Sequence, residues 1–199
     1  MNALTLELAH AAARLVVEEG LEYAAAKRKA ARALSPSARR PELPSNEAVE
    51  DAVREELALF HADSQPTELR ALRGLALRWM ERLADFRPHL GGAVWRGTAT
   101  RLSAIHLDLY ADDPKSPEIA LLNLHVTYDA RGSGHGGPGE PQATLVIADR
   151  PPSGGGPVTL FLAVHDHDAL RGALKPDSRG RSWRGDLQAL RRLLEADPQ

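Results

Sequence analysis

GAVWRGTATRLSAIHLDLY, residues 92–110, is the stretch of the sequence that decides the fold. Its first part is bounded by two glycines, which is typical of a tight turn. From residue 104 to residue 111 apolar and polar side chains alternate, which predicts a β-strand with one apolar face. The polar side chains His106 and Asp108 are two positions apart, so they share the other face. The stretch therefore predicts a glycine turn that leads into a strand.

The sequence on either side of this stretch predicts helices before it and a small sheet after it. Apolar residues recur at helical spacing ahead of it, and Pro88 ends the last of these helices. The strands expected after it are 126–128, 143–148 and 158–164, and the expected helices are 116–124 and 184–196. A glycine-rich loop at 131–141 separates two of the strands. We expect an α+β fold in which a helical region, 1–87, packs against a small mixed-sheet domain, 88–199.

The composition is that of an ordinary globular protein. The chain has 199 residues, 43% of them hydrophobic, and a formal net charge of −2. It can therefore bury a core, but it has no global attraction to nucleic acid or anionic lipid. It contains no cysteine, which excludes disulfides, thiolate metal sites and cysteine nucleophiles. Residues 1–20 lack the order of a signal peptide, and no apolar run approaches the roughly 20 residues that cross a bilayer. We expect a cytoplasmic protein without a membrane partner.

The segment that begins at Gly92 resembles the signature of the DNA polymerase β-like nucleotidyltransferase superfamily, roughly G-S-x-x-x-G-x-x-x-x-x-S-D-I-D-L. Gly92 and Gly97 match its two glycines and Ser103 matches its later serine, whereas Ala93 stands where the first serine would be. The resemblance implies a nucleotidyltransferase-like α/β domain in which Gly92, Gly97 and Ser103 hold nucleotide phosphates. Arg96, beside the second glycine, is a further candidate to bind a phosphate.

The two metal-binding aspartates of this signature correspond to Ala104 and His106. Alanine cannot bind a metal, and imidazole suits Mg²⁺ less well than a carboxylate does. A register shifted by two residues would let His106 and Asp108 act as the catalytic and metal-binding pair. The resemblance also implies a third catalytic carboxylate from a later strand, for which Asp149 is the best-placed candidate. A cofactor, Mg²⁺ or Mn²⁺, is therefore expected only if this altered site is active.

These residues also have ordinary structural interpretations. Asp108 can be a solvated acid at a strand end, and His106 a half-buried, hydrogen-bonded residue. Asp149 stands before two prolines and can be a turn former. We therefore expect a nucleotidyltransferase-like protein with a degenerate active site that binds a nucleotide or a partner protein. An active metal-dependent transferase that uses His106 and Asp108 is the alternative.

A basic cluster provides a second alternative, and it consists of Lys27, Arg28, Lys29 and Arg32. It follows a helix and a glycine turn, an arrangement that can place a recognition helix in the major groove of DNA. Residues 1–90 contain 13 Lys and Arg against 14 Asp and Glu, a difference of −1, so this half lacks the positive surplus expected of a nucleic-acid partner. A solvated helix face is the other interpretation.

His165-Asp166-His167-Asp168 is the most metal-like cluster by composition. If a strand continued through it, His165 and His167 would share one face, a spacing found in metal sites. The other interpretation is the end of a strand, with Asp168 capping the turn that follows.

The whole chain is also similar to an uncharacterised family of short bacterial proteins, some of which carry the label UDP-N-acetylmuramate–alanine ligase. That label does not fit these residues. Such a ligase needs a G-K-[ST] loop to hold ATP, and no Gly-Lys pair occurs in the chain.

Overall fold

The computed structural model describes residues 3–34, 42–132, 140–172, 176–177 and 179–196. The chain forms two compact units, which we call the helical unit and the α/β unit. The helical unit consists of Met1–Leu69 and Thr98–Ser103, and the α/β unit of Arg70–Gly97 and Ala104–Gln199. The division lies inside a long helix rather than at residue 87, because most of that helix packs in the α/β unit.

The helical unit is built from α1 (Ala3–Glu19), α2 (Tyr23–Leu34), α3 (Asn46–Phe60) and the first residues of α4 (Gln65–Arg82). Alanine, leucine and valine side chains of the first three helices form its core. The turn between α1 and α2 needs a glycine, because Gly20 has φ +68° and a Cβ there would lie 2.8 Å from the Leu102 carbonyl oxygen. The segment Thr98–Ser103 thus packs directly on this turn.

The α/β unit contains a six-stranded mixed sheet in the order β3-β4-β5-β2-β1-β6. The strands are β1 (His89–Gly91), β2 (Ile105–Ala111), β3 (Asp129–Gly132), β4 (Ala143–Asp149), β5 (Val158–Asp166) and β6 (Gly185–Asp186). β2 and β5 are parallel, and the other neighbouring strands are antiparallel. The remaining elements are η1 (Ala84–Phe86), α5 (Gly92–Arg96), α6 (Ser116–Asn123), η2 (His167–Gly172) and α7 (Leu187–Ala196).

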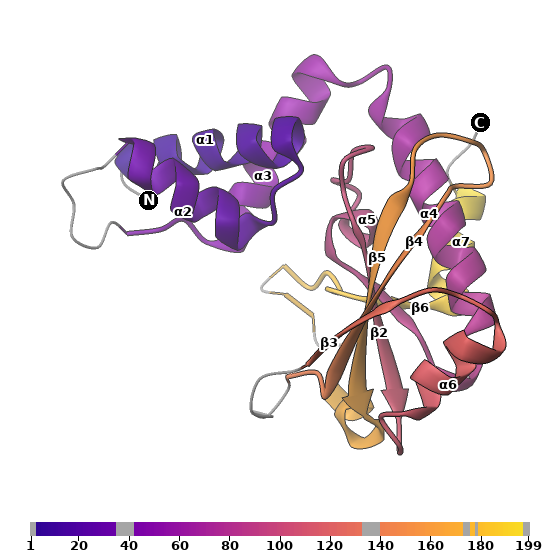
Figure 1. The fold of residues 1–199 in the computed structure, drawn as a ribbon. Helices are drawn as coiled ribbons and strands as arrows, with labels where there is room; N and C mark the ends of the chain where they lie inside the picture. The colour runs from indigo at the N-terminus through magenta and orange to yellow at the C-terminus, as the bar shows by residue number, and fades with distance from the viewer. Residues whose placement is uncertain (1–2, 35–41, 133–139, 173–175, 178, 197–199) are drawn as a thin grey trace. The chain divides into compact units, whose positions relative to one another are not determined.

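The two faces of the sheet differ in chemistry because side chains alternate along each strand. One face is apolar and buried, and its inner side chains include Leu107, Leu109, Leu145, Ile147, Leu160, Leu162 and Val164. Helices α4, α6 and α7 lie on one side of the sheet (Figure 1) and cover this face. The opposite face, which we call the open face, carries His106, Asp108 and Tyr110 of β2 beside Phe161 and His165 of β5.

The α+β class and the helical N-terminal half are confirmed, and the strand expected at 104–111 is β2, an inner strand. Residues 126–128, where a strand is expected, are instead an irregular segment that follows the C-terminus of α6. His125 has φ +54°, and the Val126 N–H donates to the Leu121 carbonyl at 3.0 Å. Because these residues satisfy carbonyls at a helix C-terminus, strand pairing is delayed until Asp129.

The last helix also begins later than the expected residue 184. Gly185 and Asp186 pair with β1 first, and the Asp186 carboxylate then accepts a hydrogen bond from the Ala189 N–H at 2.8 Å. This is the geometry of an N-terminal cap, so α7 begins at Leu187.

The glycine-rich loop expected at 131–141 falls largely on residues 133–139, which lie outside the described residues. The strands β3 and β4 on either side of it pair in antiparallel register. Within the described ranges, the helices are all too short or too polar to cross a membrane.

Candidate binding site on the open sheet face

His106 lies beside the glycine turn, as the sequence predicts. Gly92 begins α5 with φ +64°, and a Cβ at this position would lie 3.3 Å from Cδ2 of His106. The positive φ and the close ring both favour glycine here. The structure therefore brings Gly92 and His106 together on the approach to β2.

Two aromatic rings form a stacked platform on the open face. The rings of His106 and Phe161 have centroids 5.1 Å apart and planes inclined by 13°. Both side chains are half-buried, and the guanidinium carbon of Arg131 lies 5.9 Å from the Phe161 centroid. We call His106 and Phe161 the ring platform, a pair of rings stacked face against face beside a cation.

Asp108, the next residue along this face of β2, is held by two partners. Its Oδ1 lies 2.9 Å from Nε2 of His165, and its Oδ2 forms an ion pair with Nε of Arg184. The side chains of Asp108 and His165 are 14% and 9% exposed. Both carboxylate oxygens are therefore engaged before any ligand arrives.

Tyr110 continues the same row of side chains. Its ring stacks on His165 with centroids 5.6 Å apart, and it meets the His89 ring edge to face at 5.4 Å. Burial and the nearby charge of Asp108 raise the pKa of Tyr110 to about 12, although Arg184 acts in the opposite direction. Tyr110 is therefore a neutral phenol at physiological pH.

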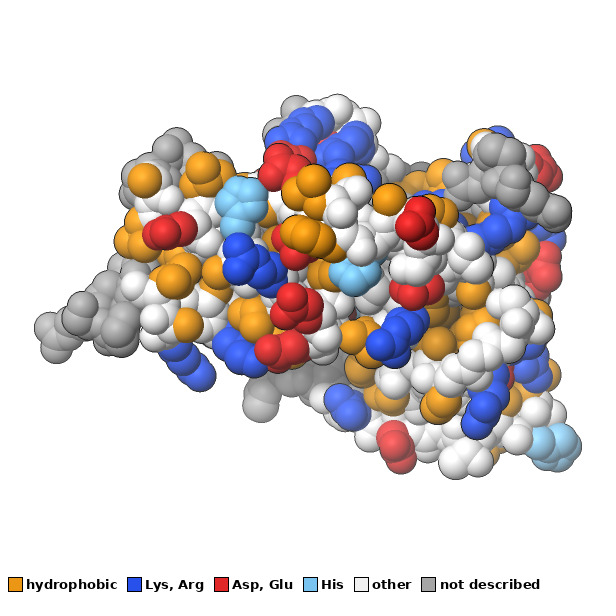
Figure 2. Space-filling model, turned by 90° about the horizontal axis from the view of Figure 1, so that it is seen from above, with side chains coloured by type: hydrophobic (Ala, Val, Ile, Leu, Met, Phe, Trp, Pro, Cys, Tyr) orange, Lys and Arg blue, Asp and Glu red, His pale blue; other side chains and the backbone are white. Residues whose placement is uncertain are grey.

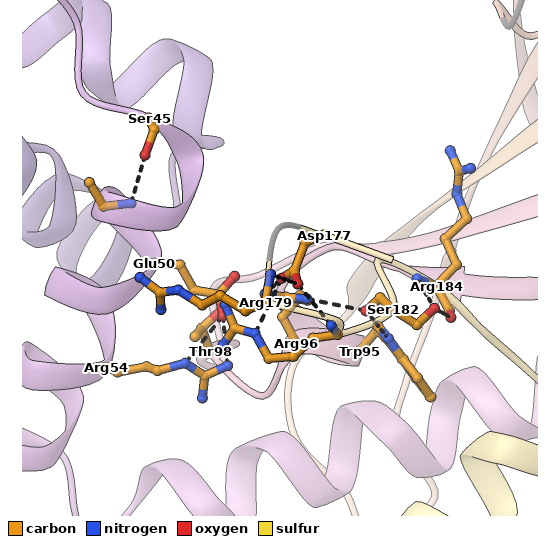
Figure 3. Close-up of polar contacts among 12 residues, drawn as sticks. Ser45, Glu50, Arg54, Trp95, Arg96, Thr98, Asp177, Arg179, Ser182 and Arg184 are labelled. Carbon is orange, nitrogen blue, oxygen red and sulfur yellow. Dashed lines mark hydrogen bonds and ion pairs between the residues drawn. The ribbon is translucent and has the colours of Figure 1, made fainter. Parts of the chain in front are cut away.

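Arg184 reaches Asp108 from the loop of residues 176–184, which Asp177 fastens to α5 (Figure 3). The buried Asp177 carboxylate accepts hydrogen bonds from Nη2 of Arg96 at 2.9 Å and from the backbone N–H groups of Arg179 and Arg181. Burial of Asp177 would raise its pKa, but these hydrogen bonds and the Arg181 charge outweigh burial and lower the pKa to about 2.

Trp95 holds the same loop from the other side. Its indole Nε1 donates to the Ser182 carbonyl at 2.9 Å. Its ring packs so closely on Gly185 that a Cβ at residue 185 would lie 2.1 Å from a ring carbon of Trp95. The guanidinium of Arg96 also lies 4.5 Å from the Trp183 ring centroid. Trp95 and Arg96 together fix the path of the loop that presents Arg184 to the sheet.

Several residues expected at the site lie elsewhere. Arg96 was a candidate phosphate ligand, but its side chain is 6% exposed and is committed to Asp177. Gly97 ends α5 with φ +80°, and its N–H donates to the Ala93 carbonyl. Ser103 belongs to the helical unit, where its Oγ accepts a hydrogen bond from a backbone N–H of the same turn.

Asp149 lies on the apolar, helix-covered face of the sheet, opposite His106 and Asp108. Its Oδ2 accepts hydrogen bonds from Nε1 of Trp79 at 2.9 Å and from Nη2 of Arg78 at 2.8 Å. Asp149 follows Ile147 by two positions and therefore shares its face. The structure thus does not bring the three proposed catalytic residues around one cleft.

The basic cluster of α2 is partly used within the helical unit. Lys27 donates to Oδ1 of Asn46 at 2.8 Å, and Lys29 pairs with Glu19, whereas Arg28 and Arg32 are exposed. Basic and acidic side chains are interspersed on the face of the protein drawn in Figure 2. The coloured residues of that face form no continuous basic stripe, which is the pattern a nucleic-acid backbone would need.

The proposed metal cluster at residues 165–168 does not keep strand geometry. β5 ends at Asp166, and His167 begins η2, so His165 and His167 are not on one strand. The Asp166 carboxylate, not that of Asp168, accepts the local backbone hydrogen bond. Across the described residues, no three His, Asp or Glu side chains are grouped as metal ligands would be.

Sequence reasoning missed Phe161, Arg131, Tyr110 and Arg184. Tyr110 was visible as a polar position of the alternating strand. The register of β5 places Phe161 beside β2, Arg131 lies on the edge strand β3, and Arg184 comes from the loop before β6. No protein-family model and no curated protein sequence matches the chain. The chemistry of the site therefore rests on its own geometry: a stacked pair of rings, an oriented guanidinium and a carboxylate–imidazole pair.

Proposed function

We propose that the open face binds a nucleotide, or a ligand that likewise combines a flat ring with an anionic group, and that this nucleotidyltransferase-like protein has lost metal-dependent transfer. The observation that carries the proposal is the ring platform of His106 and Phe161, half-buried and flanked by Arg131. A nucleobase gains about 1–3 kcal/mol by stacking on an aromatic side chain. A surface of this kind suits the base of a nucleotide.

Arg184 supplies a cation for the anionic end of the ligand. Its Nε is paired with Asp108, which orients the guanidinium, and its side chain is 38% exposed. Among the described residues, its terminal Nη atoms form no hydrogen bond. Guanidinium groups held in this way bind phosphate with directional, charge-assisted hydrogen bonds.

The order of elements around β2 also supports the proposal. A helix bounded by Gly92 and Gly97 connects β1 to β2, and Gly92 packs on His106. The resemblance implies a glycine turn before an inner strand, and this order of elements supports the proposal.

The donor set argues against transfer chemistry. Mg²⁺ prefers carboxylate oxygens, but Asp108 is paired on both oxygens and Asp149 lies on the other face. A metal at Asp108 would have to replace the arginine partner. We therefore propose a binding module, working in the cytoplasm, rather than an active transferase.

Isothermal titration calorimetry with ATP, GTP, CTP and UTP tests this function. We expect saturable binding in EDTA, weakened at least about tenfold by Phe161→Leu and by Arg184→Gln. The matched controls are Phe60→Leu and Arg14→Gln, because both residues are exposed and belong to the helical unit.

Two outcomes would overturn the proposal. One is the absence of saturable binding for all four nucleotides. The other is equal affinity in Phe161→Leu and Phe60→Leu. Binding that requires Mg²⁺ and is lost in Asp108→Ala would instead favour the active transferase.

A further inference from the structure

His165 is held in one tautomer by Asp108. Its Nε2 lies 2.9 Å from Oδ1 of Asp108, and because an ionised carboxylate only accepts hydrogen bonds, the Nε2–H donates. In the neutral ring the lone pair is then on Nδ1. A carboxylate that fixes the tautomer and orientation of an imidazole is the arrangement in which histidine acts as a general base.

The side chain of His165 is 9% exposed, and among the described residues its Nδ1 has no hydrogen-bond partner. Within the described ranges, the side-chain nitrogen and oxygen atoms that are sealed from solvent and lack a partner are Nε of Arg78 and Nη2 of Arg181. Nδ1 of His165 is not among these sealed atoms. The basic nitrogen is therefore available to a water molecule.

The surroundings of His165 suit a reaction that develops negative charge. Asp108 and Tyr110 face it from β2, His89 of β1 lies behind the Tyr110 ring, and Arg184 is paired with Asp108. Asp108 can stabilise an imidazolium, whereas the guanidinium of Arg184 can stabilise an anion. The neutral Tyr110 hydroxyl is a further hydrogen-bond donor.

We propose that Asp108 and His165 form a general-base dyad that activates water for the metal-independent hydrolysis of a phosphate ester. The inference rests on the proposed function for one point, that the natural ester belongs to a nucleotide on the ring platform. His106 and Asp108 are two residues apart on β2, which is about 7 Å. The sugar phosphate of a nucleotide whose base lies on the platform is therefore within reach of the dyad.

In the reaction, Nδ1 of His165 takes a proton from water while the water oxygen forms a bond to phosphorus. The bond between phosphorus and the leaving oxygen breaks, and the leaving oxygen keeps the electron pair. Asp108 stabilises the imidazolium, and Arg184 stabilises the charge on the phosphoryl oxygens. The imidazolium then gives its proton to the leaving group or to solvent.

Release of nitrophenolate from bis(4-nitrophenyl) phosphate, measured with the full chain in EDTA, tests the dyad without a nucleotide. We expect a rate above buffer that falls about a hundredfold or more in His165→Gln. Asp108→Asn should reduce the rate as well, because an amide no longer fixes the tautomer. His61→Gln, at the end of α3, and Asp85→Asn, an exposed residue of η1, are the matched controls and should leave the rate unchanged.

If a variant fails to fold, the dyad can still be tested by measuring the hydrolysis rate of the unmodified protein as a function of pH. A general base requires the rate to fall as acid protonates Nδ1, whereas a merely structural His165 predicts no such limb while the fold persists. A rate equal to buffer in EDTA, or a rate that His165→Gln leaves unchanged in a folded protein, would overturn the dyad.

The two proposals fail separately. Nucleotide binding in calorimetry without ester hydrolysis refutes the dyad and leaves the binding site. Dyad-dependent hydrolysis without nucleotide binding refutes the nucleotide and leaves the dyad with another phosphate ester as its substrate.

Discussion

Arg96 and Arg184 are both arginines of the α/β unit, but their surroundings differ. Arg96 is 6% exposed and binds Asp177, the Ser182 carbonyl and the Trp183 ring. Arg184 is 38% exposed and, among the described residues, bonds to Asp108 through its Nε. Because guanidinium nitrogens that are already bonded cannot also bind phosphate, Arg184 rather than Arg96 is the proposed ligand-binding cation. Arg96 instead holds the loop that delivers it.

Acid should loosen the loop of residues 176–184 through Asp177. The folded pKa of about 2 lies below the ordinary value of 3.8, so the stabilisation is present above 3.8 and is lost as the pH falls towards 2. We expect the urea midpoint of the unmodified protein to fall more steeply between about pH 4 and pH 2 than that of Asp177→Asn. Parallel curves for the two proteins would contradict this assignment.

Alkali should act on Tyr110 in the opposite direction. Its folded pKa of about 12 lies above the ordinary 10.0, so the stabilisation is complete below pH 10 and is lost as the pH rises through about 12. In an absorbance titration at alkaline pH, we expect the component that ionises near 12 to disappear in Tyr110→Phe. Loss of a component near 10 instead would show that Tyr110 is freely solvated.

Sequence alone could predict which side chains of β2 share a face, but not which residues lie beside them. His106 and Asp108 follow from alternation within one strand. Their partners Phe161, His165 and Arg184 follow from strand register and from a loop fastened by buried contacts. Such pairing depends on the whole sheet, so no local pattern encodes it.

α4 shows how one helix secures the covered face of the sheet. Trp79 is 1% exposed, and its indole N–H binds Asp149 at the end of β4. Arg78, one residue earlier, binds the same carboxylate oxygen. Asp149, which the sequence suggested as a catalytic acid, therefore links α4 to β4.

Asp149→Ala should therefore affect stability rather than ligand binding. The substitution leaves the buried indole N–H without an acceptor, which costs about 1–3 kcal/mol. We expect the free energy of unfolding to fall by this amount, with unchanged nucleotide affinity in calorimetry. Asp85→Ala is the control on an exposed acid. Loss of nucleotide binding in a folded Asp149→Ala protein would show that Asp149 takes part in ligand binding.

Long elements were predictable and short ones were not. β2 and β5 have enough alternating residues to show their period, whereas β1 and β6 have three and two residues. Those short strands exist because of pairing with neighbours, not because of their own sequence. For the same reason the strand expected at 126–128 was placed too early: β3 begins at Asp129, after the residues that cap α6.

At the scale of the whole molecule, charge is balanced. The formal net charge is −2, and two of the four cations of the α2 cluster have partners within the helical unit. A surface on which cations and acids balance neutralises few phosphates, so its affinity for duplex DNA is low and depends only weakly on salt. Balanced charge therefore favours a small ligand over a nucleic acid.

We accordingly expect duplex DNA retention to be weak at physiological salt and little changed by combined Arg28→Ala and Arg32→Ala substitutions. Electrophoretic mobility shifts over a range of salt concentrations would measure it, with Arg171→Gln as the control. Tight retention that these substitutions abolish would favour the DNA-binding alternative.

The pairing of β1 with β6 has a kinetic consequence. His89 meets Asp186 across nearly the full sequence of the α/β unit, and parallel β2 and β5 are also far apart in sequence. When such distant segments meet, the chain loses a large loop-closure entropy before the new contacts stabilise it, and this slows folding. A newly made chain would therefore acquire its helices early and complete the sheet edge, and with it the placement of Arg184, among its last steps.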